Sequence, residues 1–133
     1  SSDREIYPYE MIAEPGSGGA ATLELDMRPL FRALVRDVNA ATDKNVMASR
    51  FHNTLVELTV KTCVKLRARN GLNIVTLSGG VFMNRILRVE ISSHLRDFRF
   101  SPLNQVRVPV NDGGISLGQL AVAAYQLGAK ACV

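Results

Sequence analysis

Cysteine and long apolar stretches are both scarce in this chain of 133 residues. Cys63 and Cys132 are its only cysteines, too few and too far apart for a metal knuckle or a CxxC redox pair. We expect Cys63 to be a buried helix residue and the protein to occupy a reducing cytoplasm. No apolar run approaches the roughly 18 residues of a membrane span, and no charged-then-apolar leader is present. The composition therefore predicts a soluble, untargeted protein with no membrane partner.

Aromatic residues are also few, at 6% of the chain, which bears on nucleic-acid binding. Sixteen basic against twelve acidic side chains give a net charge of +4, and the excess lies between Lys61 and Arg107. Such a region can attract anionic ligands. It lacks the interleaved aromatic and basic residues of a single-strand stacking platform. We expect a solvated helix surface and no nucleic acid.

Glycine pairs form two turns in the second half of the chain. Ile74–Leu77 predicts a buried strand that ends in Ser78-Gly79-Gly80, and Asn111-Asp112-Gly113-Gly114 repeats the pattern. Paired glycines let the backbone approach a ligand closely, and the next helix N-terminus attracts phosphate or carboxylate. The alternative for Gly79 and Gly80 is a tight turn with close helix–strand packing alone. The sequence predicts a nucleotide site whose candidate residues are Ser78, Gly79, Gly80, Asn84, Gly113 and Gly114.

Three side chains near these patterns carry candidate chemistry. Asn84 would lie one helical turn beyond Gly80 and could hydrogen-bond a ribose or a base. Asp112 is a good N-cap for the last helix, or a hard oxygen ligand for a divalent cation. His52 is either a surface or core histidine, or a proton carrier in the cleft. We take His52 as the candidate catalytic residue and Asp112 as the candidate metal ligand.

Hydrophobic periodicity predicts alternating strands and helices, and hence an α/β fold. Residues 14–19 are expected to be a flexible hairpin tip, since no P-loop lysine is present. Phe51, Leu55, Leu58, Thr62 and Leu66 should form the buried face of one long helix. The expected strands are 6–13, 21–27, 73–77, 97–100 and 105–108, and the expected helices are 29–40, 46–69, 81–95 and 113–127.

Three motifs, found in one order, resemble the C-terminal part of the HypF carbamoyltransferases. They are Arg50-Phe51-His52-Asn53-Thr54, the segment Ser78 to Arg85, and the segment Val108 to Gln119. The resemblance runs from about Tyr7 to Ala124. It implies one lobe of an actin/Hsp70-like, ribonuclease H-like ATPase domain with a mixed sheet flanked by helices. It also implies that Asp112 is a ligand of the active-site metal.

The resemblance implies a function for the intact enzyme as well. HypF proteins make carbamoyl-adenylate from carbamoyl phosphate and ATP, and pass the carbamoyl group to the C-terminal cysteine of HypE during nickel–iron hydrogenase maturation. HypF proteins are several times longer, and this chain lacks both an initiator methionine and the family's His-x-x-x-His metal pair. We therefore expect a single-domain fragment, residues 1–133, that is inactive alone. The alternatives are a threonylcarbamoyl-transferring tRNA-modification relative, or a non-catalytic nucleotide-binding lobe that self-associates.

Overall fold

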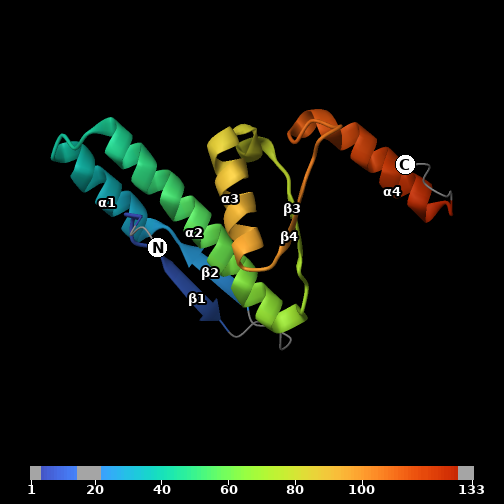
Figure 1. Ribbon diagram of the computed structural model, residues 1–133, viewed down its shortest axis with the longest axis horizontal. Helices are drawn as coiled ribbons and strands as arrows, with labels where there is room; N and C mark the ends of the chain where they lie inside the picture. Colours follow the sequence, from blue (N-terminus) through green and yellow to red (C-terminus); the bar gives the residue numbers. More distant parts are fainter. Residues whose placement is uncertain (1–3, 15–21, 129–133) are drawn as a thin grey trace. The chain divides into compact units, whose positions relative to one another are not determined.

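The computed structural model describes residues 4–14 and 22–128, which belong to two compact units, Ser1–Leu58 and Thr59–Val133. The α/β class expected from the sequence is confirmed, with the strands divided between two small sheets (Figure 1). None of the described helices is both long and apolar enough to cross a membrane. The elements are β1 (Glu10–Glu14), β2 (Thr22–Asp26), α1 (Arg28–Asn39), α2 (Lys44–Asn70), β3 (Ile74–Leu77), α3 (Arg85–Asp97), β4 (Ser101–Asn104) and α4 (Ile115–Gln126).

The first unit joins the hairpin of β1 and β2 to α1 and the start of α2. The two strands are antiparallel, with Glu10 opposite Asp26 and Glu14 opposite Thr22. Of the expected hairpin tip, residues 15–19 lie outside the described residues. Helix α1 has Pro29 in its first turn, where the absent N–H costs nothing. Its apolar face is buried in a small core of Tyr7, Leu30 and Ala33, against which Met27, Leu34 and Phe51 pack.

Helix α2 begins earlier than expected because Asp43 caps it. The Asp43 carboxylate accepts hydrogen bonds from the N–H groups of Asn45 (2.9 Å) and Val46 (3.3 Å). The expected single buried face of α2 is wrong. Its buried residues are Thr54, Val56, Leu58 and Val60, whereas Leu66 is exposed. Positions two residues apart point about 200° apart on a helix, so α2 is buried on more than one side.

The second unit contains β3, α3 and β4 as a parallel crossover. Ile74 lies opposite Ser101 and Leu77 opposite Asn104. The expected strands at 97–100 and 105–108 are wrong. Helix α3 continues to Asp97, and the chain then turns through Arg99, whose φ of 61° lets the Phe100 N–H donate to the Leu95 carbonyl at 2.9 Å. Strand pairing therefore starts only at Ser101. The core of this unit is formed by Leu77, Leu87, Ile91, Leu95 and Phe100.

Candidate functional site

A backbone hydrogen bond joins the two glycine turns of the second unit. The Gly79 N–H donates to the Val110 carbonyl at 2.8 Å, immediately before Asn111. Gly79 has φ 107° and ψ 160°, a conformation that favours glycine over any residue with a side chain. Strand β3 thus ends in a turn whose shape requires Gly79 and whose position is tied to the second turn. The two motifs predicted to share one site are adjacent in the structure.

Gly80 does not have the same backbone reason to be glycine. A Cβ built on Gly80 meets no atom within 4 Å, and its φ is not in the left-handed region. Gly80 opens a short 3-10 helix, Gly80–Met83, so its N–H and that of Val81 have no acceptor within that helix. The result is an open patch of backbone with donors at its surface. A ligand that approached this patch would be blocked by a side chain at residue 80.

The second glycine pair is packed tightly against the preceding segment. A Cβ on Gly114 would lie 2.6 Å from the Pro109 carbonyl oxygen, and one on Gly113 would lie 3.2 Å from Asn111 Oδ1. Gly114 is therefore needed for the turn itself, because any side chain there would collide with backbone. The predicted role of Gly113 and Gly114 in nucleotide binding stays a prediction. Their packing gives a separate reason for glycine that the sequence did not reveal.

Asn84 is a helix cap, and the expectation that it lies one turn inside a helix is wrong. Its side-chain oxygen accepts from the N–H groups of Ile86 (3.0 Å) and Leu87 (3.3 Å). The chain needs a cap here because α3 starts at Arg85, after the 3-10 helix rather than with it. Ser78 lies at the same end of β3, and its hydroxyl accepts a hydrogen bond from the Gln105 amide at 3.3 Å. The proposed contacts of both residues with a nucleotide are untested.

Asp112 does not cap the last helix, contrary to one expectation from the sequence. The Asn111 side chain accepts from the Gly113 N–H at 3.2 Å instead, and α4 has Gly114 at its N-cap with no side-chain bond. The Asp112 carboxylate is exposed. Residues 4–14 and 22–128 contain no group of three or more His, Cys, Asp or Glu side chains that could hold a metal ion. Asp112 could therefore bind a divalent cation only together with further ligands from outside the described residues.

His52 is half-buried on α2 in the first unit, whereas the glycine turns belong to the second. Its Nδ1 lies 2.8 Å from the Ala48 carbonyl oxygen, and its ring meets Phe51 edge to face. Since a carbonyl only accepts, Nδ1 carries the proton and Nε2 is the acceptor in the neutral ring. His94 makes the same contact with the Glu90 carbonyl at 2.8 Å. This contact fixes the tautomer but does not distinguish a catalytic histidine, so the role of His52 stays a prediction.

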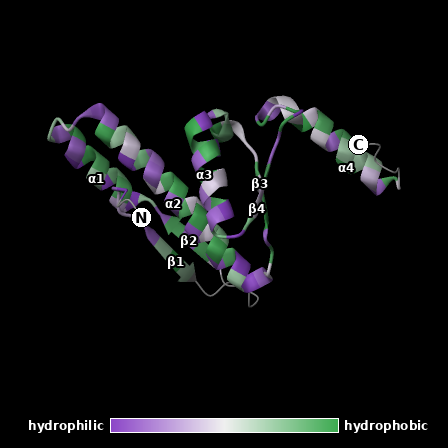
Figure 2. Ribbon diagram, in the orientation of Figure 1, coloured by the Kyte–Doolittle hydropathy of each residue, from purple (hydrophilic) through white to green (hydrophobic). Residues whose placement is uncertain are grey.

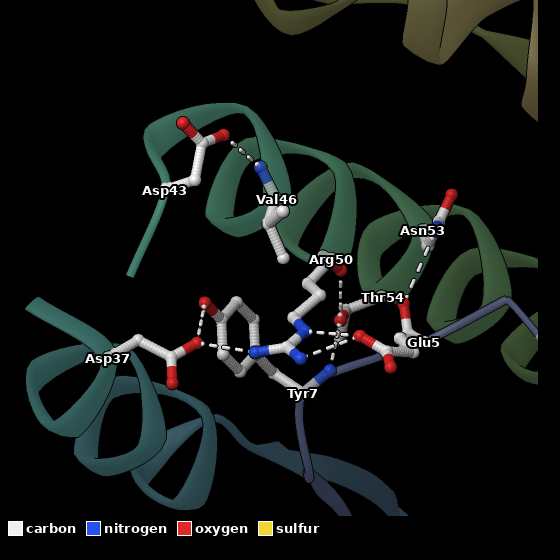
Figure 3. Close-up of polar contacts among 8 residues, drawn as sticks. All are labelled: Glu5, Tyr7, Asp37, Asp43, Val46, Arg50, Asn53 and Thr54. Atoms are coloured by element: carbon white, nitrogen blue, oxygen red, sulfur yellow. Dashed lines mark hydrogen bonds and ion pairs between the residues drawn. The ribbon is translucent and has the colours of Figure 1, made fainter. Parts of the chain in front are cut away.

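A polar network in the first unit was not predicted from the sequence (Figure 3). The hydroxyl of the fully buried Thr54 accepts from the Tyr7 N–H at 2.8 Å and donates to the Arg50 carbonyl at 2.7 Å. The Arg50 guanidinium bridges Glu5 (2.6 Å) and Asp37 (2.9 Å). These contacts hold residues 5–7 against α1 and α2. Thr54 was not among the residues expected on the buried face of α2, so the sequence pattern did not indicate this network.

Tyr7 and Asp37 influence each other's protonation within this network. The Tyr7 hydroxyl donates to Asp37 Oδ2 at 2.7 Å, and this bond is the main reason that the pKa of Asp37 is lowered, with Arg50 adding to the effect. Burial, followed by the hydrogen bond to Asp37, raises the pKa of Tyr7. Both shifts favour a neutral tyrosine beside a charged carboxylate. The pair therefore stays in one hydrogen-bonded form across the neutral range.

The chain is similar to known proteins over nearly its whole length. Residues 1–119 match the family described as "Carbamoyltransferase, Kae1-like Domain, second subdomain". This chain belongs to the HypF carbamoyltransferase family. Carbamoyltransferase HypF of Synechocystis sp. is 37% identical over 116 residues, which are 87% of this chain and 14% of that protein. Carbamoyltransferase HypF2 of Cupriavidus necator is 37% identical over 99 residues, covering 74% of this chain and 12% of that protein.

Solved HypF structures agree with the family assignment. A full-length HypF in the phosphate- and nucleotide-bound form superposes with a TM-score of 0.85 at 33% identity, over 96% of this chain and 16% of that one. The HypF of T. kodakarensis has the same fold, with a TM-score of 0.67 at 21% identity. The chain thus spans about one seventh of the length of the HypF relatives that it matches. The resemblance recognised from the three sequence motifs is confirmed.

Proposed function

We propose that this chain is the nucleotide-cleft lobe of a cytoplasmic carbamoyltransferase, forming one domain over residues 1–133. The enzyme would transfer a carbamoyl group from carbamoyl-adenylate to the C-terminal cysteine of a HypE-type acceptor during nickel–iron hydrogenase maturation. The observation that carries this proposal is the hydrogen bond from the Gly79 N–H to the Val110 carbonyl, beside the open backbone at Gly80. The phosphate- and nucleotide-bound HypF relative supports it.

The backbone at Gly80 would bind the adenylate part of the substrate. The N–H groups of Gly80 and Val81 are suited to donate to phosphate or ribose oxygens, because the 3-10 helix leaves them without acceptors. Ser78 and Asn84 flank this patch and would add side-chain contacts. Gly113 and Gly114 would keep the second turn close enough for its backbone to reach the same ligand. These groups bind and orient, and none of them exchanges a proton.

The transfer itself would take place on the acceptor cysteine. Its thiolate would attack the carbamoyl carbon, forming a C–S bond while the bond from that carbon to the adenylate oxygen breaks and AMP leaves. Backbone donors at the glycine turns would stabilise the charge that develops on the leaving phosphate. His52 would orient the substrate or accept a proton through Nε2, since Nδ1 is bound to Ala48.

A divalent metal would require ligands besides Asp112, because residues 4–14 and 22–128 contain no group of three or more His, Cys, Asp or Glu side chains placed to hold one. Asp112 would supply one carboxylate oxygen, which is a suitable donor for such a cation. The carbamoyl phosphate and ATP from which carbamoyl-adenylate is made would be used elsewhere in the full-length protein. We therefore propose that this chain alone has no carbamoyl-transfer turnover. Carbamoylation of a HypE C-terminal peptide by the isolated chain, above a control without protein, would disprove this part.

Nucleotide affinity of a Gly80→Val variant tests the central claim in the full-length protein. The added side chain would occupy the open space over the backbone, and we expect it to weaken the binding of ATP by about tenfold or more, or about 1.4 kcal/mol. Gly118→Val is the matched control, because a Cβ there also meets no atom within 4 Å but lies on α4. Isothermal titration calorimetry measures both. If a folded Gly80→Val protein bound ATP with unchanged affinity, the turn at Gly80 would have only a structural role and this part of the proposal would be wrong.

Two alternative functions differ from this proposal in the molecule that accepts the carbamoyl-type group. One has a different acceptor, and the other has no acceptor. A threonylcarbamoyl-transferring relative would bind the nucleotide in the same way but would modify tRNA instead of a HypE peptide. A non-catalytic lobe would bind nucleotide or self-associate without transfer in the full-length protein. Mass spectrometry of a HypE C-terminal peptide and of tRNA, each incubated with the full-length protein and its substrates, separates the three. A mass increase of one carbamoyl group on the peptide cysteine is the expected result.

A further inference from the structure

Asn111 bridges the two glycine turns of the second unit through its side chain. Its Oδ1 accepts a hydrogen bond from the Gly113 N–H at 3.2 Å, and its Nδ2 donates one to Met83 Sδ at 3.3 Å. Gly113 lies in the second turn. Met83 ends the 3-10 helix that begins at Gly80 and follows the first turn. One amide group therefore contacts two segments of the chain that are 28 positions apart.

The backbone beside this amide is bonded to the same two turns. The Val110 carbonyl accepts from the Gly79 N–H at 2.8 Å, and the Asn111 carbonyl accepts from the Gly114 N–H at 3.0 Å. Val110 and Asn111 together thus make two hydrogen bonds with each turn. Of their two bonds toward the first turn, only the one from Asn111 to Met83 comes from a side chain. That bond can be removed by substitution without changing the backbone.

Met83 supplies the acceptor for this bond. Glycine, valine and phenylalanine occupy the other positions of the 3-10 helix, whose hydrophobic residues appear green between β3 and α3 in Figure 2. The methionine sulfur is therefore the one side-chain acceptor of this helix, although a weak one. Met83 is 64% exposed, so apolar burial does little to keep its side chain beside Asn111. The Asn111 amide is thus the polar group that holds the Met83 side chain at the second turn.

Asparagine is the residue type that such a bridge requires. Its side chain carries an acceptor and a donor on one carbon, whereas aspartate carries acceptors only. Serine can accept from an N–H two residues ahead, as Asn111 does from Gly113, but it does so more weakly and is too short to reach Met83 as well. A turn that needed only its own N–H satisfied would accept either aspartate or serine. The donor to Met83 is what distinguishes asparagine here.

We propose that Asn111 is a positioning residue that fixes the distance between the two backbone turns of the nucleotide site. The inference rests on the proposed function, in which the N–H groups of Gly80 and Val81 bind the adenylate part of the substrate. Those donors lie between Gly79 and Met83, each of which is bonded to Asn111 or to the residue before it. The donors are therefore held in place before a ligand arrives, which lowers the entropy cost of binding. Asn111 itself would touch no ligand.

Two other roles of Asn111 give different results. A purely structural asparagine would stabilise the second turn through Gly113 without affecting the nucleotide, so neither Asn111 nor Met83 would matter for affinity. An asparagine that contacts the nucleotide directly would lower the affinity when it is changed, but again without any dependence on Met83. Only the positioning role couples the two residues. A double-mutant cycle measures such a coupling directly.

Titration calorimetry of ATP with the full-length protein provides the affinities for this cycle. Asn111→Ser keeps an acceptor for the Gly113 N–H but lacks the donor to Met83, and Met83→Leu removes the sulfur with nearly the same volume. We expect each change to weaken ATP binding about fivefold, or about 1 kcal/mol, which is the usual net contribution of one hydrogen bond. The double variant should bind no more weakly than either single variant, because all three lack the same bond. Thermal unfolding checks that each variant is folded.

Matched controls change the same residue types elsewhere on the chain. Asn70→Ser alters another asparagine whose side-chain oxygen accepts from an N–H two residues ahead, that of Leu72 at 2.9 Å. Met47→Leu alters a half-buried methionine of α2. Both controls should bind ATP as the wild type does, and equal weakening in them would overturn the proposal. So would unchanged affinity in either Asn111→Ser or Met83→Leu, or losses that add in the double variant.

Gly80→Val in the same titrations separates this inference from the proposed function. If Gly80→Val weakens ATP binding while Asn111→Ser or Met83→Leu does not, only the positioning role is wrong. If Gly80→Val leaves the affinity unchanged, the proposed site is wrong, and the positioning role is overturned with it. The expected result is weaker binding in Gly80→Val, Asn111→Ser and Met83→Leu, with coupling between the last two alone.

Discussion

Replacing Thr54 tests whether the polar network holds residues 5–7 in place. Among the described residues, the Tyr7 N–H donates a hydrogen bond only to the Thr54 hydroxyl. The Thr54 side chain is fully buried. Thr54→Val keeps the shape of the side chain but leaves this buried N–H without a partner. An unsatisfied buried donor costs roughly 1–3 kcal/mol, so we expect the free energy of unfolding to fall by about 2 kcal/mol.

Thr54→Ser is the matched control for this change. Serine keeps the hydroxyl and removes one methyl group, which should cost about 0.8 kcal/mol by loss of apolar burial. Both variants are measured by urea unfolding of the chain, together with the amide hydrogen exchange of Tyr7. Exchange at Tyr7 should accelerate in Thr54→Val and stay slow in Thr54→Ser. A valine variant that is as stable as the serine variant and keeps Tyr7 protected would refute the assigned role of Thr54.

Four further predictions concern the turns, the network and the candidate metal ligand. Gly114→Ala should destabilise the chain strongly in thermal unfolding because its Cβ would lie 2.6 Å from the Pro109 carbonyl oxygen, whereas Gly80→Ala should not. Ala41 has φ 52°, a left-handed conformation that costs alanine roughly 1–2 kcal/mol relative to glycine. Ala41→Gly should therefore stabilise the end of α1 by about 1 kcal/mol. An unchanged midpoint of urea unfolding would contradict this. The pKa of Asp37 is lower in the folded protein than the value of 3.8 in the unfolded chain, so the ionised carboxylate stabilises the fold above pH 3.8. This stabilisation is lost as the pH falls through the folded pKa. The Tyr7→Phe variant lacks the hydrogen bond that is the main cause of the shift, so its stability should fall less steeply with pH in acid unfolding curves. Asp112→Asn in the full-length protein should leave the unfolding midpoint nearly unchanged, since Asp112 caps no helix, while metal content and carbamoyl transfer both fall; wild-type values of both would remove Asp112 from the metal site.

The sequence did not predict the end of α3 or the cap near the last helix, because each depends on the contacts of a single residue. The strand expected at 97–100 falls where Arg99 adopts a left-handed conformation and ends α3, a geometry that glycine usually signals and arginine does not. Capping of the last helix was one of the two roles expected for Asp112, yet Asn111 is the residue whose side chain accepts the nearby N–H. Neighbouring residues of similar capping ability are distinguished only by where the turn places them.

The sequence by itself determined the family, the α/β class and the two glycine turns. These features follow from local rules, because periodicity and glycine positions constrain the backbone near each residue. Only the tertiary structure decided that Gly79 bonds to Val110, that Gly114 is packed against Pro109, and that Tyr7 meets Asp37 and Thr54. Those contacts join residues as far apart as 47 positions in the chain. Their energies depend on distance in space after folding, which no local pattern of residues encodes.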